Sequence, residues 1–276
     1  MSRSHLHPTP PHLRAPYLRA PSRAAFLAIV AGCVLTLVLA GCGGARTAGG
    51  AASATEPRPV VVFAAASLTA AFQQIAATNP QLDVRFMFDG SPTLVEQLGA
   101  RPDVADVLAT ADEVTMGKAA QAGLVSADQR LVATNTPVLI VPKGNPGRIT
   151  GLDSSLAGKK LVVCAPAVPC GAAAWAVARN AGYDLRPVSE EQKVTDVLGK
   201  VTSGEADAGI VFSTDAKRAG DAVATLPLPG AERVVSRSVI ALVTQARHPE
   251  AAAEFIRLVT GDTGRAVLAS HGFTLP

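Results

Sequence analysis

The residues that could do chemistry lie where a predicted strand gives way to a helix. Ser67, Ser91, Cys170-Gly171 and Ser213 each stand at such a junction. In an open α/β sheet, ligands bind beyond the carboxyl ends of the strands. Helix N-termini at that edge offer unpaired N–H groups and a partial positive charge. Several of them together would bind an anion without any Lys or Arg. Because Ser is also a common helix N-cap, capping alone is the competing interpretation for each serine.

Alternating apolar segments predict the elements that position these junctions. Apolar runs predict strands at 60–64, 82–88, 104–109, 136–141, 161–164, 208–212 and 234–243. Apolar residues at helical spacing predict helices after Ser67, Ser91 and Asp112, at 172–181 and 190–202, after Ser213, and at 249–259 and 263–270. Ser67, Ser91 and Asp112 are predicted N-caps, with Pro92 as the first helical residue after Ser91. This βα alternation predicts two α/β lobes, joined by crossing strands, with a cleft between them.

The N-terminal segment predicts export and lipidation. An apolar run from Ala24 to Ala40 ends in Leu39-Ala40-Gly41-Cys42, a small-residue stop followed at once by cysteine. This pattern predicts a lipoprotein signal peptide over 1–41, removed in the mature protein, with Cys42 as the lipidated residue. The alternative is a transmembrane anchor, for which 17 residues are at the short end of the required length. Residues 42–58 are small and polar and are expected to form a flexible tether.

Removing the leader changes the charge balance. Arg3, Arg14, Arg19 and Arg23 precede Cys42, so four of the 25 basic residues but none of the 22 acidic ones would be lost. The remaining 21 basic residues form no basic block, which argues against a nucleic-acid partner. Only His248 and His271 remain of five histidines, which disfavours a histidine-based metal or acid–base site.

Cys164 and Cys170 are the cysteines that remain beyond Cys42. An isolated pair outside the cell is often a disulfide. Two further ligands would be needed for a metal site, and a redox-active dithiol usually has the tighter C-x-x-C spacing. We therefore favour a structural disulfide, with two buried thiols as the alternative.

Seven segments of the chain follow one another in the order of a known family. They are Val62-Phe63-Ala64-Ala65-Ala66-Ser67-Leu68-Thr69, Phe88-Asp89-Gly90-Ser91-Pro92-Thr93-Leu94, 105–112, 135–139, Val168-Pro169-Cys170-Gly171, 209–216 and 271–274. In these segments the chain resembles the molybdate-binding lipoproteins and periplasmic proteins of ABC transporters. The resemblance covers nearly all of 59–276. It implies a type II periplasmic-binding-protein fold in which each lobe is an open, mostly parallel sheet flanked by helices. Lobe 1 would comprise 59–136 plus 237–276, and lobe 2 would comprise 137–236, with the ligand in the interlobe cleft.

The resemblance also implies a ligand set. The two serine ligands of the family, each donating hydroxyl and main-chain N–H, match Ser67 and Ser91. Its main-chain donors in the second lobe match Cys170 and Val194. A tyrosine hydroxyl completes the family set, but here that position is Phe212, which has no donor. Ser213, Thr214 or a trapped water are the candidates to replace the missing hydroxyl.

The implied function is capture of molybdate, and also tungstate, on the outer face of the cell membrane for import by a cognate ABC permease. The implied protein is a lipid-anchored monomer that is not an enzyme, needs no cofactor, and holds molybdenum only as bound molybdate. The same fold binding another oxyanion such as sulfate is the alternative. An enzyme on this fold is a remote one, because no G-x-S-x-G elbow is present and no base is expected near Ser67 or Ser91.

Overall fold

The computed structural model describes residues 56–276. The predicted signal peptide 1–41, the lipidation site Cys42 and most of the tether 42–58 lie outside the described residues. Within 56–276, no helix combines the length and the apolar character that crossing a membrane requires.

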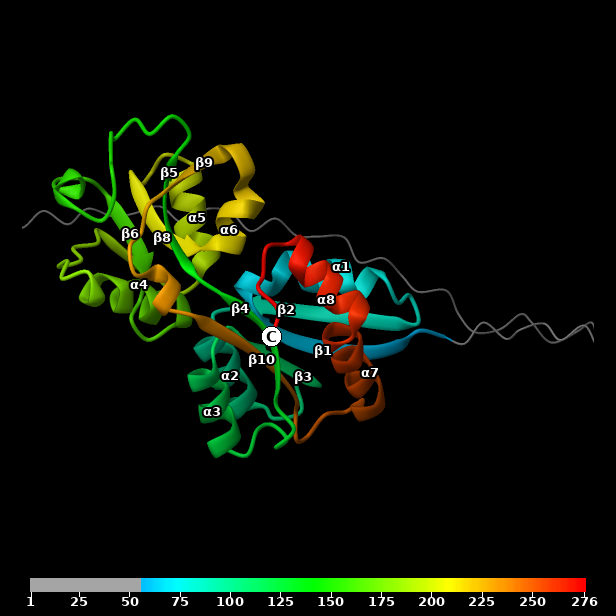
Figure 1. The fold of residues 1–276 in the computed structure, drawn as a ribbon. Coiled ribbons are helices and arrows are strands. Elements are labelled where there is room, and N and C mark those ends of the chain that lie inside the picture. The colour runs from blue at the N-terminus through cyan, green and yellow to red at the C-terminus, as the bar shows by residue number, and fades with distance from the viewer. Residues whose placement is uncertain (1–55) are drawn as a thin grey trace, which may run out of the picture. The chain divides into compact units, whose positions relative to one another are not determined.

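The first lobe is built on a five-stranded sheet with the order β2-β1-β3-β10-β4 (Figure 1). Its strands are β1 (Arg58–Ala65), β2 (Leu82–Asp89), β3 (Val107–Thr110), β4 (Arg130–Asn135) and β10 (Ser236–Leu242). Its helices are η1 (Ala66–Leu68), α1 (Thr69–Ala77), α2 (Ser91–Ala100), α3 (Glu113–Gln121), α7 (Pro249–Thr260) and α8 (Asp262–Ser270). One face packs against α1, α7 and α8 through Phe72 and Phe255, and the other against α2 and α3 through Leu98 and Met116.

The second lobe repeats this plan with a sheet of order β7-β6-β8-β5-β9. Its strands are β5 (Pro137–Pro142), β6 (Leu161–Cys164), β7 (Ser189–Glu191), β8 (Ala208–Phe212) and β9 (Val223–Leu226). Its helices are η2 (Ser154–Leu156), α4 (Pro169–Asn180), α5 (Val194–Thr202), α6 (Ser213–Ala219), η3 (Gly220–Ala222) and η4 (Ala231–Arg233). Val197 and Val201 of α5 pack on one face, and Ala174 and Val177 of α4 on the other.

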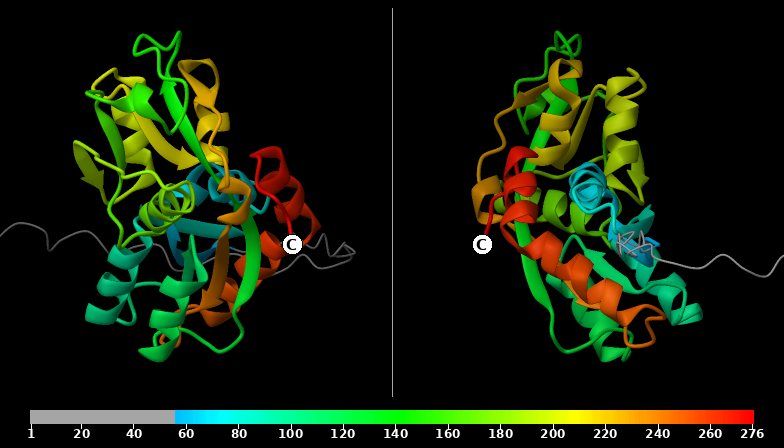
Figure 2. Two further views of the ribbon diagram at one scale, coloured as in Figure 1. Left: turned by 60° about the vertical axis from the view of Figure 1, so that its left-hand side comes forward. Right: turned by 90° about the vertical axis from the view of Figure 1, so that its right-hand side faces the viewer.

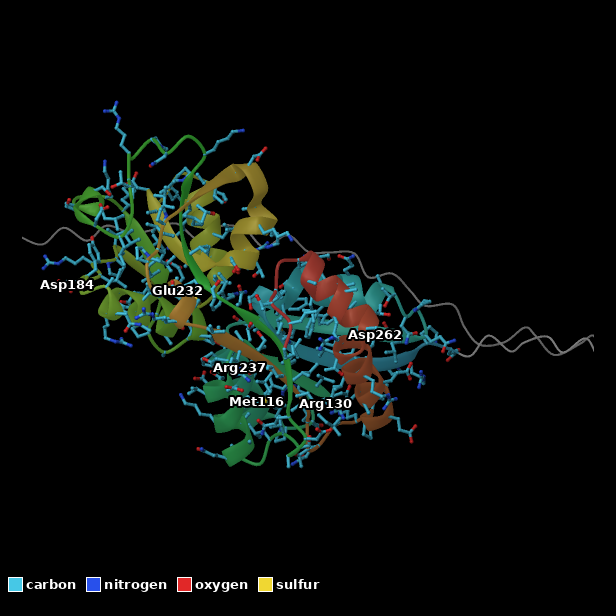
Figure 3. The ribbon with its side chains drawn as sticks, viewed as in Figure 1. Met116, Arg130, Asp184, Glu232, Arg237 and Asp262 are labelled. Carbon is cyan, nitrogen blue, oxygen red and sulfur yellow. A yellow bond between two sulfur atoms is a disulfide. The ribbon has the colours of Figure 1, made fainter. Side chains whose placement is uncertain are left out.

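Both lobes have helices on both faces of their sheet, which explains why the central strands are continuously apolar. Charged side chains such as Asp184, Glu232 and Asp262 are exposed on the outside of the two lobes (Figure 3). The chain passes between the lobes twice, from β4 through Thr136 into β5, and from β9 into β10 (Figures 1 and 2). The α/β class and the two-lobed architecture expected from the sequence are confirmed.

The sheets are mixed rather than mostly parallel, which corrects one expectation. In the first lobe, β1 is parallel to β2 and β3, whereas β10 is antiparallel to β3 and β4. The second lobe shows the same balance around β6, β8 and β5. The antiparallel pairings arise where the chain enters a sheet after crossing from the other lobe. The short edge strands β4 and β9 were not predicted.

Three helix starts also differ from expectation. No side-chain bond caps η1 or α1, so Ser67 is not the N-cap but lies inside the 3-10 turn η1. Ser91 is the first residue of α2, and Gly90 is its N-cap. The helix predicted at 190–202 begins only at Val194, because 189–191 pair with β6 as a strand. Asp112 does cap α3 as predicted, accepting a hydrogen bond from the Thr115 N–H.

Candidate functional site

A small pocket lies between the two lobes, at the ends of the strands from which the helices start. It is lined by Ala65, Ala66, Ser67, Asp89, Gly90, Ser91 and Ala111 of the first lobe and by Val168, Pro169, Cys170, Gln192, Lys193, Val194 and Phe212 of the second. The space inside it is about 20 Å³, far below the roughly 300–1,000 Å³ of pockets for drug-sized ligands. All five residues expected to contact a ligand therefore line one pocket, whose size suits a small ion.

The first lobe presents two serines to this pocket. Ser91 is almost fully buried, with 1% of its surface exposed, and its Oγ accepts a hydrogen bond of 3.0 Å from the Ala111 N–H. Ala111 is itself fixed by the Ser236 hydroxyl, which donates to its carbonyl at 2.8 Å. Because the Ser91 oxygen already accepts, its own proton is available for a ligand in the pocket. Ser67, in η1, is half-buried, and its hydroxyl is not used to cap a helix.

The second lobe contributes the N-termini of α4 and α5. Cys170 is the second residue of α4 and Val194 is the first residue of α5. First-turn N–H groups have no partner within the helix and carry its partial positive charge. Together with the starts of η1 and α2, four chain segments place first-turn residues around one pocket. The arrangement can bind an anion through uncharged donors.

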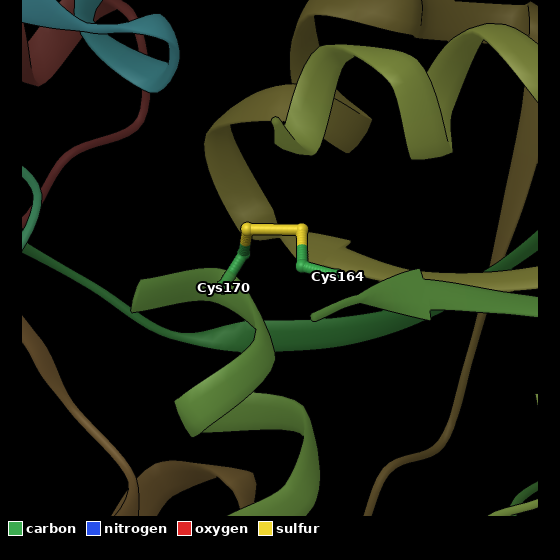
Figure 4. The surroundings of a disulfide bond; sticks show 2 residues. All are labelled: Cys164 and Cys170. Carbon is green, nitrogen blue, oxygen red and sulfur yellow. A yellow bond between two sulfur atoms is a disulfide. The ribbon is translucent and has the colours of Figure 1, made fainter. Parts of the chain in front are cut away.

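A disulfide fixes the start of α4. Cys164, at the end of β6, is bonded to Cys170 in the structure (Figure 4). The turn between them is tight, since a Cβ on Gly171 would lie 1.8 Å from the Ala165 carbonyl oxygen. The bond and this close approach hold the Cys170 N–H at the pocket wall.

Phe212 closes the pocket at the end of β8 and is 2% exposed. Neither hydroxyl proposed to replace the missing tyrosine lies at the pocket wall, which corrects that expectation. Ser213 Oγ donates to Asn135 Oδ1 at 2.9 Å, and Thr214 Oγ1 accepts from Asn135 Nδ2 at 2.7 Å. Neither residue lines the pocket. Both are engaged at the crossing between β4 and β5, so the Phe212 wall is apolar.

The charged residues that line the pocket are Asp89 and Lys193, and they pair with each other. Lys193 Nζ lies 3.5 Å from Asp89 Oδ1, which also accepts the Gly90 N–H at 2.8 Å. The pocket therefore gains no net charge from its side chains. Sequence reasoning missed both residues, together with Gly90, Gln192 and Ala111. From the sequence, Asp89-Gly90 predicts only a turn. The order of residues along the chain does not indicate that this turn contacts the segment before α5.

Comparison with known proteins decides the family. Residues 60–274 match the family described as bacterial extracellular solute-binding protein. The chain belongs to that family. It is 40% identical over 260 residues to the molybdate-binding protein ModA of Mycobacterium tuberculosis, covering 91% of this chain and 99% of the relative. It is 29% identical over 232 residues to the protein of the same name from Escherichia coli, covering 78% and 89%.

Solved structures agree on the fold of this family member. The periplasmic molybdate-binding protein of Azotobacter vinelandii superposes with a TM-score of 0.69 at 21% identity, covering 79% of this chain and 99% of the other. The sulfate-binding protein SubI of Mycobacterium tuberculosis superposes with a TM-score of 0.60 at 20% identity, covering 78% and 86%. At such identities the similarity shows the two-lobed fold alone.

Proposed function

We propose that this solute-binding protein captures molybdate, and also tungstate, for import by an ABC permease. The observation that carries the proposal is the meeting of helix N-termini from both lobes around one small pocket without net side-chain charge. Ser67 and Ser91 would each donate a hydroxyl and a main-chain N–H, and Cys170 and Val194 a main-chain N–H. The 40% identity to mycobacterial proteins named molybdate-binding supports the same ligand.

Donor chemistry gives this pocket a basis for selectivity. Molybdate and tungstate are fully deprotonated tetrahedral dianions that only accept hydrogen bonds. Monohydrogen phosphate carries a proton that a cage of donors leaves unpaired, which is costly in a buried site. Sulfate has the same charge but is smaller, so donors fixed for molybdate would lie too far from its oxygens. The preference for molybdate over sulfate therefore rests on how rigidly the four segments are held.

The pocket does not favour the enzyme alternative. His248 Nδ1 lies 3.2 Å from Asp106 Oδ2, and His271 Nε2 lies 2.7 Å from Gln74 Oε1, and neither histidine lines the pocket. Asp89 is the carboxylate near Ser91, and it is paired with Lys193. A serine nucleophile needs an adjacent base, so we propose binding without turnover.

The remaining parts of the proposal concern placement. Residues 59–136 with 237–276 would form one rigid body and 137–236 the other, and the two would close on the ligand as a monomer. Cleavage before Cys42 and its acylation would hold the protein on the outer face of the cell membrane, beside its permease. Mass spectrometry of the protein extracted from its native membrane tests this, since it must show a diacylated Cys42 as the first residue.

Calorimetric titration of the purified protein with molybdate, tungstate, sulfate and phosphate tests the ligand. We expect heat with the first two and little with phosphate. Ser67→Ala should weaken molybdate binding by about one to two powers of ten, since a hydrogen bond to a charged group contributes about 1.5–3 kcal/mol. Ser91→Ala should weaken binding similarly and also lower stability by about 1–3 kcal/mol, because the buried Ala111 N–H loses its acceptor. Tight binding of sulfate alone would favour the sulfate alternative, and unchanged molybdate affinity in both variants would contradict the assigned site.

A further inference from the structure

Two short segments, one from each lobe, meet at the wall of the pocket. Asp89 and Gly90 end β2 and precede α2 in the first lobe, whereas Gln192 and Lys193 precede α5 in the second. A Cβ placed on Gly90 would lie 2.4 Å from the Gln192 carbonyl oxygen. We call these four residues the closure seam. Each half of the seam is followed directly by a proposed ligand donor, Ser91 in one lobe and Val194 in the other.

The glycine in the seam is not required by its own backbone. Gly90 has φ −61° and ψ 137°, an extended conformation that any L-residue adopts. A methyl group would fit the turn within the first lobe but would collide with the backbone of the second lobe. A contact of 2.4 Å cannot be relieved by rotating a flexible side chain, because the obstructing atom is a main-chain oxygen. The need for glycine therefore arises only when the lobes are together.

The ion pair in the seam neutralises a carboxylate that lies next to the proposed anion site. The Asp89 side chain is 20% exposed, and its Oδ1 is held by the Gly90 N–H, so it stays at the pocket. Left unpaired, it would repel an incoming dianion. Lys193 reaches Asp89 from the other lobe and cancels that charge only when the seam is formed. The two contacts therefore depend on the same approach of the lobes.

We propose that the closure seam sets how tightly the protein holds its oxyanion: Gly90 admits the second lobe and Lys193 neutralises Asp89. This inference rests on the proposed oxyanion-binding function and assigns Gly90, Asp89 and Lys193 as positioning residues. Gly90 lets Ser91 and Val194 come into register, and Lys193 keeps the Asp89 carboxylate from repelling the ligand.

The test compares Gly90→Ala with Gly99→Ala in the same full-length chain. Gly99 lies near the end of α2, and a Cβ there would meet only Leu124 Cδ1 at 3.9 Å, an ordinary contact. We expect Gly90→Ala to weaken molybdate binding by about tenfold or more, equivalent to 1.4 kcal/mol or more, and Gly99→Ala to leave it unchanged. Gly99→Ala should unfold at or above the wild-type temperature, because Gly→Ala at a compatible site restricts the unfolded chain. Gly90→Ala should still unfold in one cooperative transition, which shows that its weaker binding is not a loss of the fold.

Hydrogen exchange separates loss of closure from local damage. In Gly90→Ala, the peptide covering 189–198 of the second lobe should exchange faster than in wild type, although the substitution lies in the first lobe. This readout needs no ligand, so it also judges the seam if the wild type binds no molybdate and the proposed function fails. Wild-type affinity with unchanged exchange at 189–198 would overturn the seam. If the wild type binds no molybdate, equal exchange at 189–198 in Gly90→Ala and wild type would overturn the seam as well.

The role of the ion pair is tested by replacing each partner in turn and comparing the molybdate affinities of the two variants. Lys193→Gln leaves the Asp89 carboxylate unpaired beside the dianion, whereas Asp89→Asn leaves a cation there. We expect Lys193→Gln to weaken molybdate binding several-fold more than Asp89→Asn does, with Lys118→Gln on the exposed end of α3 as the unaffected control. Equal losses in the two seam variants, or a larger loss in Asp89→Asn, would contradict the neutralising role of Lys193.

Discussion

At the scale of single residues, the pocket works through what each polar group is already bonded to. Ser91 Oγ accepts a hydrogen bond from the Ala111 N–H, which leaves the Ser91 proton for a ligand. The Ser213 hydroxyl donates its proton to Asn135 and cannot also donate it to a ligand. Two serines at similar strand-to-helix junctions thus have opposite roles. Residue type and spacing cannot distinguish them, because the difference lies in partners brought from distant parts of the chain.

Phe212 lies at the position where the resemblance described above leads us to expect a tyrosine hydroxyl. Phe212→Tyr should place a hydroxyl at the apolar wall and tighten molybdate binding, by up to one to two powers of ten for a hydrogen bond to a charged group. Calorimetry on Phe212→Tyr measures the change, with Phe212→Leu as a control that removes the ring without adding a donor. Weaker binding by the tyrosine variant would mean that the pocket is shaped around the phenyl ring.

Asp215, next to this wall in sequence, carries a testable pH dependence. Burial raises the pKa of Asp215 to about 6, an effect that the Arg218 guanidinium, 3.3 Å away, only partly offsets. Between its unfolded value of 3.8 and about 6, the folded protein holds a proton that the unfolded chain has released, so stability from this group is lost as pH rises. At neutral pH the ionised carboxylate then destabilises the fold by up to about 3 kcal/mol.

Asp215→Asn removes this penalty while keeping a hydrogen-bond acceptor. Relative to wild type, its free energy of unfolding should rise by up to about 3 kcal/mol at pH 7.5 and change little at pH 4. Urea denaturation of both proteins at the two pH values measures this difference in the free energy of unfolding. The other titrating groups are present in both proteins, so their contributions cancel. A gain that is equal at both pH values would contradict the role of ionisation.

At the scale of elements, the strands and most helices could be predicted because both lobes bury continuous apolar strands under amphipathic helices. The predictions fail where pairing between distant segments decides the outcome. Residues 189–191 form an edge strand because β6 is beside them, although their own pattern favours a helix. Five pocket residues could be placed through the family resemblance. The closure seam could not, since it depends on how closely two turns approach.

The disulfide between Cys164 and Cys170 joins the end of β6 to the first turn of α4. Replacing both cysteines with serine should lower the free energy of unfolding by about 2 kcal/mol, the chain-entropy value for so short a loop. It should also weaken molybdate binding, because the Cys170 N–H is no longer held at the pocket. Chemical denaturation and calorimetry measure the two effects. Loss of stability with full affinity would show that the tight turn at Gly171 suffices to position this donor.

At the scale of the whole molecule, the two lobes together assemble what neither has alone. The first lobe supplies Ser67 and Ser91, and the second supplies the N-termini of α4 and α5. The charged residues at the junction pair with each other, so in the proposed site the attraction for a dianion would come from oriented N–H and O–H groups.

A crystal structure of the protein with molybdate, with the metal located by anomalous scattering at the molybdenum edge, tests directly whether uncharged donors from both lobes hold the ligand. We expect one molybdenum between the lobes, with its oxygens bonded to the hydroxyls of Ser67 and Ser91 and the main-chain N–H groups of Cys170 and Val194, while Lys193 remains paired with Asp89. Molybdenum at another place, or an oxyanion held chiefly by the Lys193 ammonium group, would contradict this expectation.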